Sequence, residues 1–452
     1  MTTSFPKISD SHIQDMFNRL QTQQWLTRQS SANTRLQKLK ALRKAIKNHE
    51  EAICQALHDD LRKSPQAAKN DLYSSYADID DAIAHLEQWM APIEVERGPL
   101  FSSGKALITY EARGVVLLFG PWNFPFNLII QPLVPIIAAG NCALVKPNEM
   151  APHTSAVCSK IIKAVFSENE VAVFEGDAGL ANRLLELPVD HIFFTGSPAI
   201  GKKVMAAAAK HLASVTLELG GKNPVIIDSS ADIQKAAATI ATYRNMNSGQ
   251  LCLCPENVWI PESKLSEFLQ TVAATYKKMF YKDGKLKPLA CGKIIDQRNL
   301  ARVKSYIDDA REQGATFICG GEVDTELMAI HPTLLVDVPA NAKILQEEVF
   351  GPVLSVFTYK DINQVYTTLH QQAKPLALYI FSEEQRFIDQ VLNNTTSGGV
   401  TINNCVMHCV EHHLPFGGVN QSGIGRYHGI HGFKELSHER AVLYPQRLAG
   451  DK

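Results

Sequence analysis

Cys252, Cys254 and Glu218 are placed where their side chains could carry out covalent and acid–base chemistry. Both cysteines lie in the polar turn that begins at Ser248, and a thiol near a helix end can be tuned towards the nucleophilic thiolate. Glu218 stands between two leucines, just before a double glycine. A buried carboxyl group there serves either as a general base or as half of a structural ion pair. Cysteines often simply pack in a core, so a structural interpretation stays open for these thiols.

A rigid turn holds a third candidate, Asn123. It lies between Pro121 and Pro125, directly after the apolar run 115–119, which is typical of a buried strand. Ligands gather at the carboxyl ends of strands in α/β sheets, and an amide fixed there can donate a hydrogen bond to a developing negative charge. Alternatively, Asn123 caps the helix that follows. The spacing favours neither interpretation.

Two further strand ends offer groups for a phosphate and a ribose. Gly196 and Gly201 frame a turn after the strand 191–194, where backbone amides, a helix start and the Ser197 hydroxyl could bind a pyrophosphate. This is not the G-x-G-x-x-G pattern, and an ordinary strand-to-helix turn would look similar. Lys146 and Glu149 follow the strand 143–145 and could hold ribose hydroxyls, or form only a surface ion pair.

Zinc is a competing interpretation of the sulfur and imidazole groups. The ligand types gather near residue 410 and in the turn after residue 248: Cys405, His408, Cys409, His412, His413, Cys252 and Cys254. Structural zinc sites prefer matched Cys-x2-4-Cys pairs, and a single residue separates Cys252 from Cys254. We therefore expect no metal site.

The elements that position these groups form two α/β series. Residues 11–63 show helical apolar spacing, and from residue 114 onward short β-branched runs alternate with helical stretches, as in βαβ units. The first series has strands near 115–119, 143–145, 171–174 and 191–194. The second has strands near 225–227, 257–260, 334–336, 354–357 and 376–381, with helices near 232–243 and 262–280. The junction falls at 218–221.

Composition excludes several classes of protein. The 452 residues carry 45 Lys and Arg against 46 Asp and Glu, a net charge of −1, which gives no overall basic field for nucleic acid. The apolar stretch 114–145 is long enough to span a bilayer, but its prolines and amides make a membrane span improbable. Nine scattered cysteines without an apolar leader favour reduced thiols in the cytoplasm.

Taken together, the motifs resemble the aldehyde dehydrogenase superfamily over nearly the whole chain, most closely its class 3 branch and bacterial coniferyl-aldehyde-dehydrogenase-like members. Any one motif is weak, but six occur in the family's order, and Cys252 follows Glu218 by 34 positions, as the family's nucleophile follows its general base. The six are the runs 121–125 (PWNFP), 194–197 (FTGS), 218–224 (ELGGKNP), 249–252 (GQLC), 347–352 (EEVFGP) and 415–418 (PFGG).

The resemblance implies a role for each matched residue. Cys252 would be the nucleophile, the Asn123 amide and the Cys252 backbone N–H an oxyanion hole, and Glu218 the base that activates water. The cofactor would lie on Lys146 and Glu149 at the adenine-side ribose, on Ser197 in the Gly196–Gly201 turn at the pyrophosphate, and on Glu348 and Phe350 at the nicotinamide ribose.

The implied fold is a Rossmann-like cofactor domain, a second α/β catalytic domain and a small β oligomerisation arm. We expect residues 1–96 and 112–217 in the cofactor domain, 218–425 in the catalytic domain, and 97–111 with 426–452 in an arm that pairs two subunits as a homodimer. Because Glu149 should repel a 2′-phosphate, NAD is favoured over NADP, although class 3 relatives can use both.

The implied reaction is oxidation of an aldehyde to a carboxylic acid. Four apolar side chains suggest an aromatic or medium-chain substrate, although ordinary core packing would explain them equally well: Trp122, Phe124, Phe126 and Met246. A CoA-acylating relative would need to keep water from the thioester, which Glu218 argues against. A non-enzymatic binding relative is the other alternative, and adjacency alone raises a reversible Cys252–Cys254 disulfide.

Overall fold

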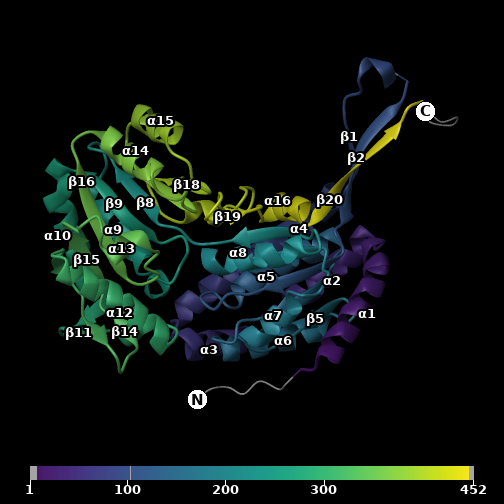
Figure 1. Cartoon of the computed structure of the whole chain (residues 1–452), viewed down its shortest axis with the longest axis horizontal. Helices are drawn as coiled ribbons and strands as arrows, with labels where there is room; N and C mark the ends of the chain where they lie inside the picture. The colour runs from purple at the N-terminus through teal and green to yellow at the C-terminus, as the bar shows by residue number, and fades with distance from the viewer. Residues whose placement is uncertain (1–7, 102, 447–452) are drawn as a thin grey trace.

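Four helices open the chain in the computed structural model, which describes residues 8–101 and 103–446 (Figure 1). Three of them begin after a serine whose side chain accepts a hydrogen bond from the first turn, the usual N-cap arrangement. The predicted amphipathic pattern is confirmed, because Leu42, Ile46, Ile53 and Leu57 are fully buried. The helices are α1 (Asp10–Arg28), α2 (Ala32–Asn48), α3 (Glu50–Leu61) and α4 (Pro65–Met90).

The first α/β series forms a six-stranded sheet in the order β19-β7-β6-β3-β4-β5. The strands from β3 to β7 are parallel, and β19 joins the edge antiparallel to β7. The strands are β3 (Val115–Phe119), β4 (Cys142–Lys146), β5 (Val171–Val173), β6 (His191–Thr195), β7 (Ser214–Glu218) and β19 (Gly423–Ile424). The connecting helices are α5 (Asn127–Ala139), α6 (Pro152–Val165), α7 (Ala178–Leu184) and α8 (Pro198–Ala209).

The second series forms a seven-stranded sheet in the order β12-β15-β16-β9-β8-β17-β18, parallel except at β12. Its strands are β8 (Asn223–Ile227), β9 (Pro255–Pro261), β12 (Thr316–Cys319), β15 (Thr333–Val336), β16 (Val353–Tyr359), β17 (Ala377–Phe381) and β18 (Gly399–Ile402). Its helices are α9 (Ile233–Arg244), α10 (Leu265–Phe280), α11 (Pro288–Cys291), α12 (Gln297–Glu312), α13 (Lys343–Gln346), α14 (Ile362–His370) and α15 (Gln385–Asn394). The prediction of two consecutive α/β sheets is therefore confirmed.

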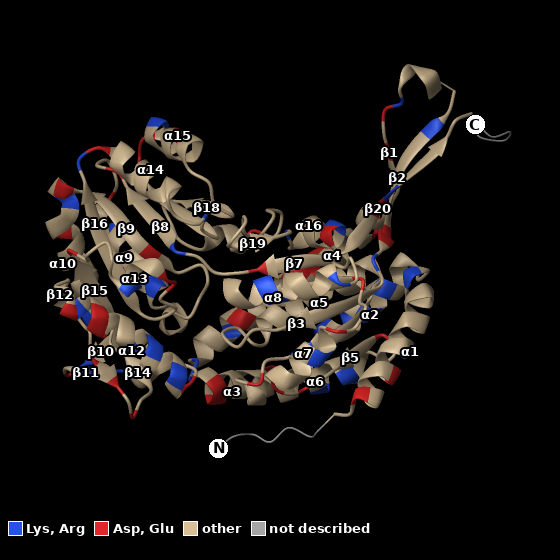
Figure 2. Cartoon of the chain, viewed as in Figure 1, with Lys and Arg blue, Asp and Glu red and all other residues tan. Residues whose placement is uncertain are grey.

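One large apolar cluster spans both sheets, since it joins Val116 of β3 to Val225 of β8, and smaller clusters cover the other faces. The chain passes from one sheet to the other between Glu218 and Asn223, so the end of β7 lies at the boundary of the two halves. Basic and acidic residues are interspersed over both halves (Figure 2), in keeping with the near-zero net charge. Within the described ranges, no helix is long and apolar enough to cross a membrane, and the stretch 114–145 folds as β3, α5 and β4.

A three-stranded antiparallel sheet projects from the body as an arm (Figure 1). It consists of β1 (Ile93–Glu94), β2 (Lys105–Ala112) and β20 (Ser437–Tyr444), and β20 follows the short helix α16 (Gly429–Glu435). The pairing of β2 with β20 runs from Lys105 opposite Tyr444 to Ala112 opposite Ser437. The ends of the predicted domain ranges, 1–7 and 447–452, and residue 102 lie outside the described residues, and the division into functional domains stays a prediction.

Short elements complete the fold away from these layers. They are β10 (Tyr281–Lys282), β11 (Lys285–Leu286), β13 (Val323–Asp324), β14 (Ala329–Ile330) and the 3₁₀ helices η1 (Pro99–Phe101), η2 (Met246–Gly249), η3 (Glu262–Lys264) and η4 (Met407–Cys409).

Candidate active site

The loop that carries Cys252 is tightly constrained. It leaves α9 through η2, where Asn247, Ser248 and Gly249 all have positive φ angles of 51°, 58° and 73°. A Cβ atom on Gly249 would lie 2.3 Å from the carbonyl of Gly351, so only glycine allows this approach to the backbone. The loop therefore has little freedom before it reaches the sulfur.

Gln250 fixes the same loop from inside, a role that its place in the sequence motif did not indicate. Its side chain is fully buried. The amide nitrogen donates to the carbonyls of Asn247 and Lys293 at 3.0 Å, and the amide oxygen accepts from the backbone N–H of Ile295 at 3.0 Å. All the hydrogen-bonding groups of this amide are thus used to hold the loop that precedes Cys252.

Asn123 contacts this loop and does not cap a helix. Its Nδ2 donates to the carbonyl of Gln250 at 3.0 Å, and Asn247 donates to the carbonyl of Asn123 at 2.8 Å. Helix α5 begins at Asn127 with Phe126 as its N-cap and no side-chain cap bond, so the capping alternative is wrong. Asn123, which follows β3, thus contacts Gln250, two positions before Cys252 in the sequence. The oxyanion-hole interpretation requires Asn123 to lie close to this loop.

Glu218 ends β7 as a buried carboxyl group, 3% exposed. Within the described part of the chain, neither of its oxygens has a hydrogen-bond partner. Burial raises its pKa well above the ordinary value, while the charge of Arg426 lowers the pKa and Glu435 raises it. Among the described residues no salt bridge to Glu218 forms, so the structural ion-pair alternative is not supported, and the general-base role stays a prediction.

The environment of Cys252 differs from the prediction. Burial raises the pKa of the Cys252 thiol well above its ordinary value, and the carboxyl groups of Glu348 and Glu218 raise it further. The expected tuning towards thiolate is therefore wrong for the protein alone, because carboxylates and not cations act on the sulfur. The same interaction shows that the sulfur and both carboxyl groups share one electrostatic environment.

Cys254 lies in the core, behind the loop that carries Cys252, and its side chain is 2% exposed. Its Sγ is directed at the carbonyls of Tyr243 and Arg244, at 3.4 and 3.6 Å. Burial raises its pKa to about 12. All nine cysteines are free, and these contacts favour the structural interpretation of Cys254 over a role in a reversible disulfide.

Glu348 and Phe350 reach the boundary between the halves from a loop before β16. A Cβ on Gly220 would lie 1.8 Å from Oε2 of Glu348, so the carboxyl group rests on the glycine pair after β7. Burial raises the pKa of Glu348 to about 8. The Phe350 ring meets Trp122 edge to face at 5.3 Å. Both residues therefore line the region between Asn123 and Glu218.

Lys222, which lies in the matched run 218–224, and Glu256 hold this loop in place, a role that the sequence did not indicate. The Lys222 ammonium pairs with Glu256 and donates to the carbonyls of Ile344 and Glu347 at 2.7 and 2.9 Å. The Glu256 carboxylate in turn accepts from the N–H of Val349 at 2.9 Å. Buried charges that are paired in this way fix neighbouring backbone.

The residues predicted to hold a dinucleotide lie at the carboxyl ends of β4 and β6. Lys146 is buried and pairs with the partly exposed Glu149. Ser197 is the N-cap of α8, but its exposed side chain makes no cap bond, so the hydroxyl and the helix N-terminus are free to meet an anion. Gly201 lies inside α8, where a Cβ would come within 2.8 Å of Leu219, so its small size serves helix–sheet packing.

The polar groups at the carboxyl ends of β4 and β6 fit a dinucleotide. The backbone N–H of Gly196 bonds to the carbonyl of Glu218 at 2.9 Å and fixes the turn. Thr195 adds a buried hydroxyl without a partner among the described residues. Uncommitted hydroxyl groups beside a helix N-terminus match a pyrophosphate, and the carboxylate of Glu149 matches ribose hydroxyls.

The four apolar side chains that suggested the substrate class are not all available to a substrate. Phe126 is fully buried in the core and its side chain is unavailable to a substrate. Phe124 is partly exposed and its ring lies under the Lys63 ammonium, 3.8 Å from the ring centroid. Met246 is 37% exposed, and Trp122 contacts Phe350. Phe126 therefore belongs to the packing alternative.

The structure does not assemble the cysteine–histidine set considered for zinc. Among the described residues, one group brings three possible ligand atoms within 4.8 Å of one another, namely Asp78, His412 and His428, and of these only His412 belongs to the predicted set. His408 instead bonds to Thr401 at 2.8 Å. The three grouped side chains already satisfy one another by hydrogen bonds, as described below.

Comparison with known proteins settles the family. The sequence model of the aldehyde dehydrogenase family matches residues 1–442. The chain belongs to the aldehyde dehydrogenase family. It is 44% identical over 433 residues to AldX of Bacillus subtilis (strain 168), which its name assigns provisionally to these enzymes, covering 95% of this chain and 97% of that protein. It is 38% identical over 410 residues to aldehyde dehydrogenase family 3 member A2 of Rattus norvegicus, covering 90% and 84%.

Solved structures agree with this assignment. A substrate-bound AldH of Staphylococcus aureus matches with a TM-score of 0.91 and 34% identity over 97% of this chain and 95% of that one. The predicted fold class and family are thus confirmed. As a member of this family, the protein is an NAD(P)-dependent oxidoreductase that oxidises aldehydes to carboxylic acids.

Proposed function

We propose that Cys252, Glu218 and Asn123 carry out the aldehyde oxidation in this chain. The Cys252 sulfur adds to the aldehyde carbon, and the oxygen of the adduct accepts hydrogen bonds from the Asn123 amide and the Cys252 backbone N–H. Collapse of this thiohemiacetal gives a thioester on Cys252. Bound NAD(P)⁺ supplies the hydride acceptor for this oxidation. Glu218 then removes a proton from the water that cleaves the thioester and releases the acid.

The observation that carries this proposal is the convergence of three chain segments on one loop. Asn123 bonds to the carbonyl of Gln250, and the Glu218 carboxyl raises the pKa of the Cys252 thiol. Because that pKa is high, the thiol needs a base before it can attack, and Glu348, the carboxyl group whose charge acts on it most, is available for that step, while Glu218 serves the later attack of water. A nucleophile, a base and an oxyanion donor are therefore available together.

For the cofactor, we propose contacts at the carboxyl ends of β4 and β6 and at the loop that carries Glu348 and Phe350. We propose NAD as the preferred cofactor, with NADP as the alternative. The Glu149 carboxylate supports this preference because it accepts hydrogen bonds from ribose hydroxyls and repels a 2′-phosphate. The proposed contact residues are Lys146, Glu149, Gly196, Ser197, Gly201, Glu348 and Phe350. Gly201 would act indirectly, through the placement of α8.

The substrate proposed is an aromatic or medium-chain aliphatic aldehyde. The partly exposed rings of Trp122 and Phe124 next to Asn123, together with Met246, support an apolar approach to Cys252. A protein of Caulobacter vibrioides, 38% identical to this chain, carries the name "Probable coniferyl aldehyde dehydrogenase", and one of Staphylococcus aureus, 36% identical, is named a 4,4′-diaponeurosporen-aldehyde dehydrogenase.

For assembly, we propose a cytoplasmic homodimer in which the β1-β2-β20 arm pairs two subunits. The support is physical, because a projecting three-stranded sheet leaves strand edges that a second copy can satisfy. A relative from Canis lupus familiaris, 37% identical, is named a dimeric enzyme. Sedimentation of the protein with and without residues 437–452 would test this assignment.

The roles of Cys252 and Glu218 are tested by single-turnover kinetics with benzaldehyde and NAD⁺. Cys252→Ser should abolish formation of NADH while nucleotide binding, followed by fluorescence quenching, is retained. Glu218→Gln should give a burst of NADH near one equivalent per site followed by slow turnover, because acyl-enzyme accumulates. Normal turnover by Cys252→Ser would refute the assigned nucleophile.

A further inference from the structure

We infer that Asp78 is a positioning residue for Glu218, acting by clamping both ends of the segment 412–429 to helix α4. This inference goes beyond the proposed catalytic residues and rests on the proposed role of Glu218. The clamp consists of Asp78, His412 and His428, and we call it the Asp78 clamp. Asp78 is distant in sequence from both histidines, and of the three residues only His412 was considered above, as a zinc ligand.

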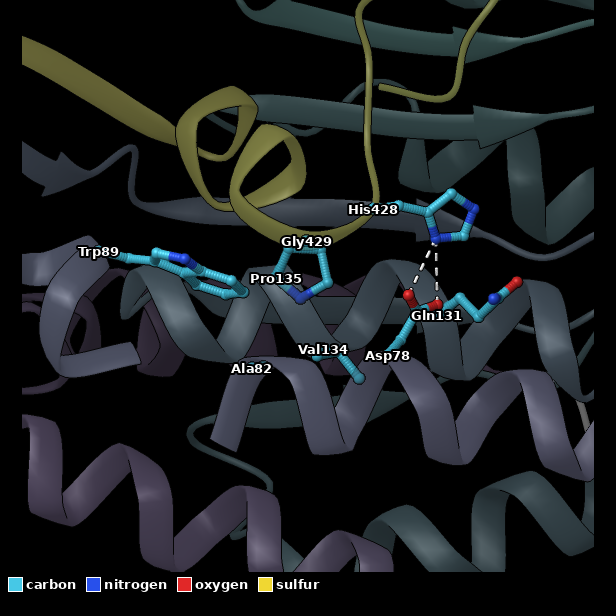
Figure 3. Close-up of a pocket in the computed structure, with 8 residues that line it drawn as sticks. All are labelled: Asp78, Ala82, Trp89, Gln131, Val134, Pro135, His428 and Gly429. Atoms are coloured by element: carbon cyan, nitrogen blue, oxygen red, sulfur yellow. Dashed lines mark hydrogen bonds and ion pairs between the residues drawn. The ribbon is translucent and has the colours of Figure 1, made fainter. Parts of the chain in front are cut away.

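The hydrogen bonds of the Asp78 clamp converge on one carboxylate. Nδ1 of His412 lies 2.7 Å from Oδ1 of Asp78, and Nδ1 of His428 lies 3.0 Å from Oδ1 and 3.1 Å from Oδ2. Figure 3 shows the His428 ring pointing down from the chain before α16 onto Asp78 of α4. Asp78 and His428 are each 4% exposed, so these bonds are shielded from water.

Charge makes this contact stronger than an ordinary hydrogen bond. Although burial alone would raise the pKa of Asp78, interactions with the two imidazoles hold it at about 2, and the bond to Asp78 raises the pKa of His412. Hydrogen bonds to an ionised carboxylate contribute roughly twice as much as neutral ones. The clamp thus holds two chain positions firmly to one helix.

The segment between the two histidines closes on itself as a hairpin. Phe416 and Tyr427 exchange both backbone hydrogen bonds, at 3.0 and 2.8 Å. At its base, a Cβ on Gly429 would lie 2.5 Å from the carbonyl of His412, so the two ends are in contact. His428 itself has a φ of 73° and a ψ of 140°, a conformation that a residue other than glycine adopts only when its surroundings enforce it.

The far part of this hairpin forms the wall around Glu218. Strand β19 pairs Gly423 directly with Glu218, and the N–H of Leu219 donates to the carbonyl of Ser422 at 3.0 Å. A Cβ on Gly417 would lie 3.1 Å from Oε1 of Glu218. Arg426, whose charge lowers the pKa of Glu218, donates to the carbonyl of Gly418 at 2.6 Å.

The hairpin affects the position of the Glu218 carboxyl group as well as its electrostatic environment. Glu218 makes no side-chain hydrogen bond among the described residues, so the backbone around it is what sets the position of its oxygens. That backbone is held at one end by β7 and at the other by the hairpin that the Asp78 clamp anchors. Loss of the clamp lets Gly417 and Arg426 shift, and displacement of a general base by about 1 Å can cost on the order of 100-fold in rate.

The experiment compares Asp78→Ala with Asp80→Ala in the full-length protein, using stopped-flow formation of NADH from benzaldehyde. Asp80 lies on the same helix but is exposed and pairs with Arg43. We expect Asp78→Ala to keep a first-turnover burst near the wild-type rate and amplitude while steady-state kcat falls about 10- to 100-fold. Asp80→Ala should match the wild type in both phases.

A second pair of variants keeps the test independent of folding. Asn places an amide donor close to where the imidazole has Nδ1, whereas Leu offers no donor, and both must adopt the same backbone conformation at this position. His428→Asn should therefore recover most of the steady-state rate that His428→Leu loses. Equal behaviour of the two variants would overturn the inference, as would a burst that falls in proportion to kcat in Asp78→Ala.

Two further outcomes separate this inference from its foundations. If Glu218→Gln turns over at the wild-type steady-state rate, the proposed role of Glu218 fails and the clamp has no base to position. If the wild-type protein binds one equivalent of zinc in elemental analysis and Asp78→Ala binds none, the three side chains are a metal site, and the hydrogen-bonded clamp is overturned.

Discussion

Replacing Asp71 with alanine should destabilise the protein strongly, because it leaves a buried cation without its partner. The Lys63 ammonium lies 2.5 Å from Asp71, and the two side chains are 4% and 7% exposed. Breaking such a pair by removing one member costs about 3–5 kcal/mol of unfolding free energy. The Phe124 ring beneath the ammonium, at 3.8 Å, is present in both the wild type and the variant and does not replace the lost carboxylate.

The surface pair between Arg43 and Asp80 provides the control. Its side chains are 42% and 48% exposed, so removing Asp80 should cost about 1 kcal/mol or less. For a unit of 150–250 residues, 1 kcal/mol corresponds to about 2–4 °C in Tm. Differential scanning fluorimetry should thus show a Tm lowered by about 6–20 °C for Asp71→Ala, and by about 4 °C or less for Asp80→Ala.

A double replacement tests whether the uncompensated charge is the cause. In Lys63→Met combined with Asp71→Leu, apolar side chains of similar size fill the space, and replacing a buried pair in this way is often neutral or stabilising. The double variant should therefore melt within a few degrees of the wild type. A Tm for Asp71→Ala equal to that of Asp80→Ala, or a double variant as unstable as the single one, would refute the reasoning.

Three further predictions concern the site itself. Because burial raises the pKa of Glu218, which must be ionised to act as a base, steady-state kcat should keep rising with pH beyond the range of an ordinary carboxyl group, and Glu218→Gln should remove this limb of the pH profile. Gly249→Ala places a Cβ 2.3 Å from the Gly351 carbonyl at a residue with a φ of 73°. The free energy of unfolding should therefore fall by about 2–5 kcal/mol, which would be measured as a lower Tm together with loss of activity. Glu149→Gln removes the charge that repels a 2′-phosphate, about 1–2 kcal/mol, and should raise the NADP-to-NAD ratio of kcat/KM about 5- to 30-fold.

Local patterns in the sequence predicted the layers of the fold because each layer has its own periodicity. The apolar runs near 115–119 and 191–194 occur as β3 and β6, and the runs near 354–357 and 376–381 occur as β16 and β17. A parallel strand buried on both faces is apolar throughout, which makes it visible in a single sequence. The long apolar stretch 114–145 is explained in the same way, as two buried strands and a buried helix.

Contacts between distant residues could not be predicted by such reasoning. His412 and Asp78 are separated by 334 positions, and nothing in the periodicity of either neighbourhood indicates the other. Gln250 stands in a recognisable motif, yet its function depends on the carbonyl of Lys293, 43 positions away. Of the four side chains expected to contact the substrate, Phe126 is fully buried in the core. The sequence cannot distinguish an aromatic residue that lines a pocket from one that packs in the core, because both are apolar and both can lie next to the same turn.

The electrostatics of the site were the hardest feature to predict, and they decide how the chemistry can start. A turn rich in polar residues suggested a thiolate, but Cys252, Glu218 and Glu348 all have raised pKa values, since burial disfavours every charge in the group. The Asn123 amide meanwhile donates to the carbonyl of Gln250. Ionising any one of these acids makes ionising its neighbours harder, so the proton losses of the three groups are coupled. Thiol attack and water activation are therefore coupled through the protonation of these groups. Glu348→Gln, which removes one negative charge, should lower the pKa of Cys252, measured from the pH dependence of its rate of alkylation.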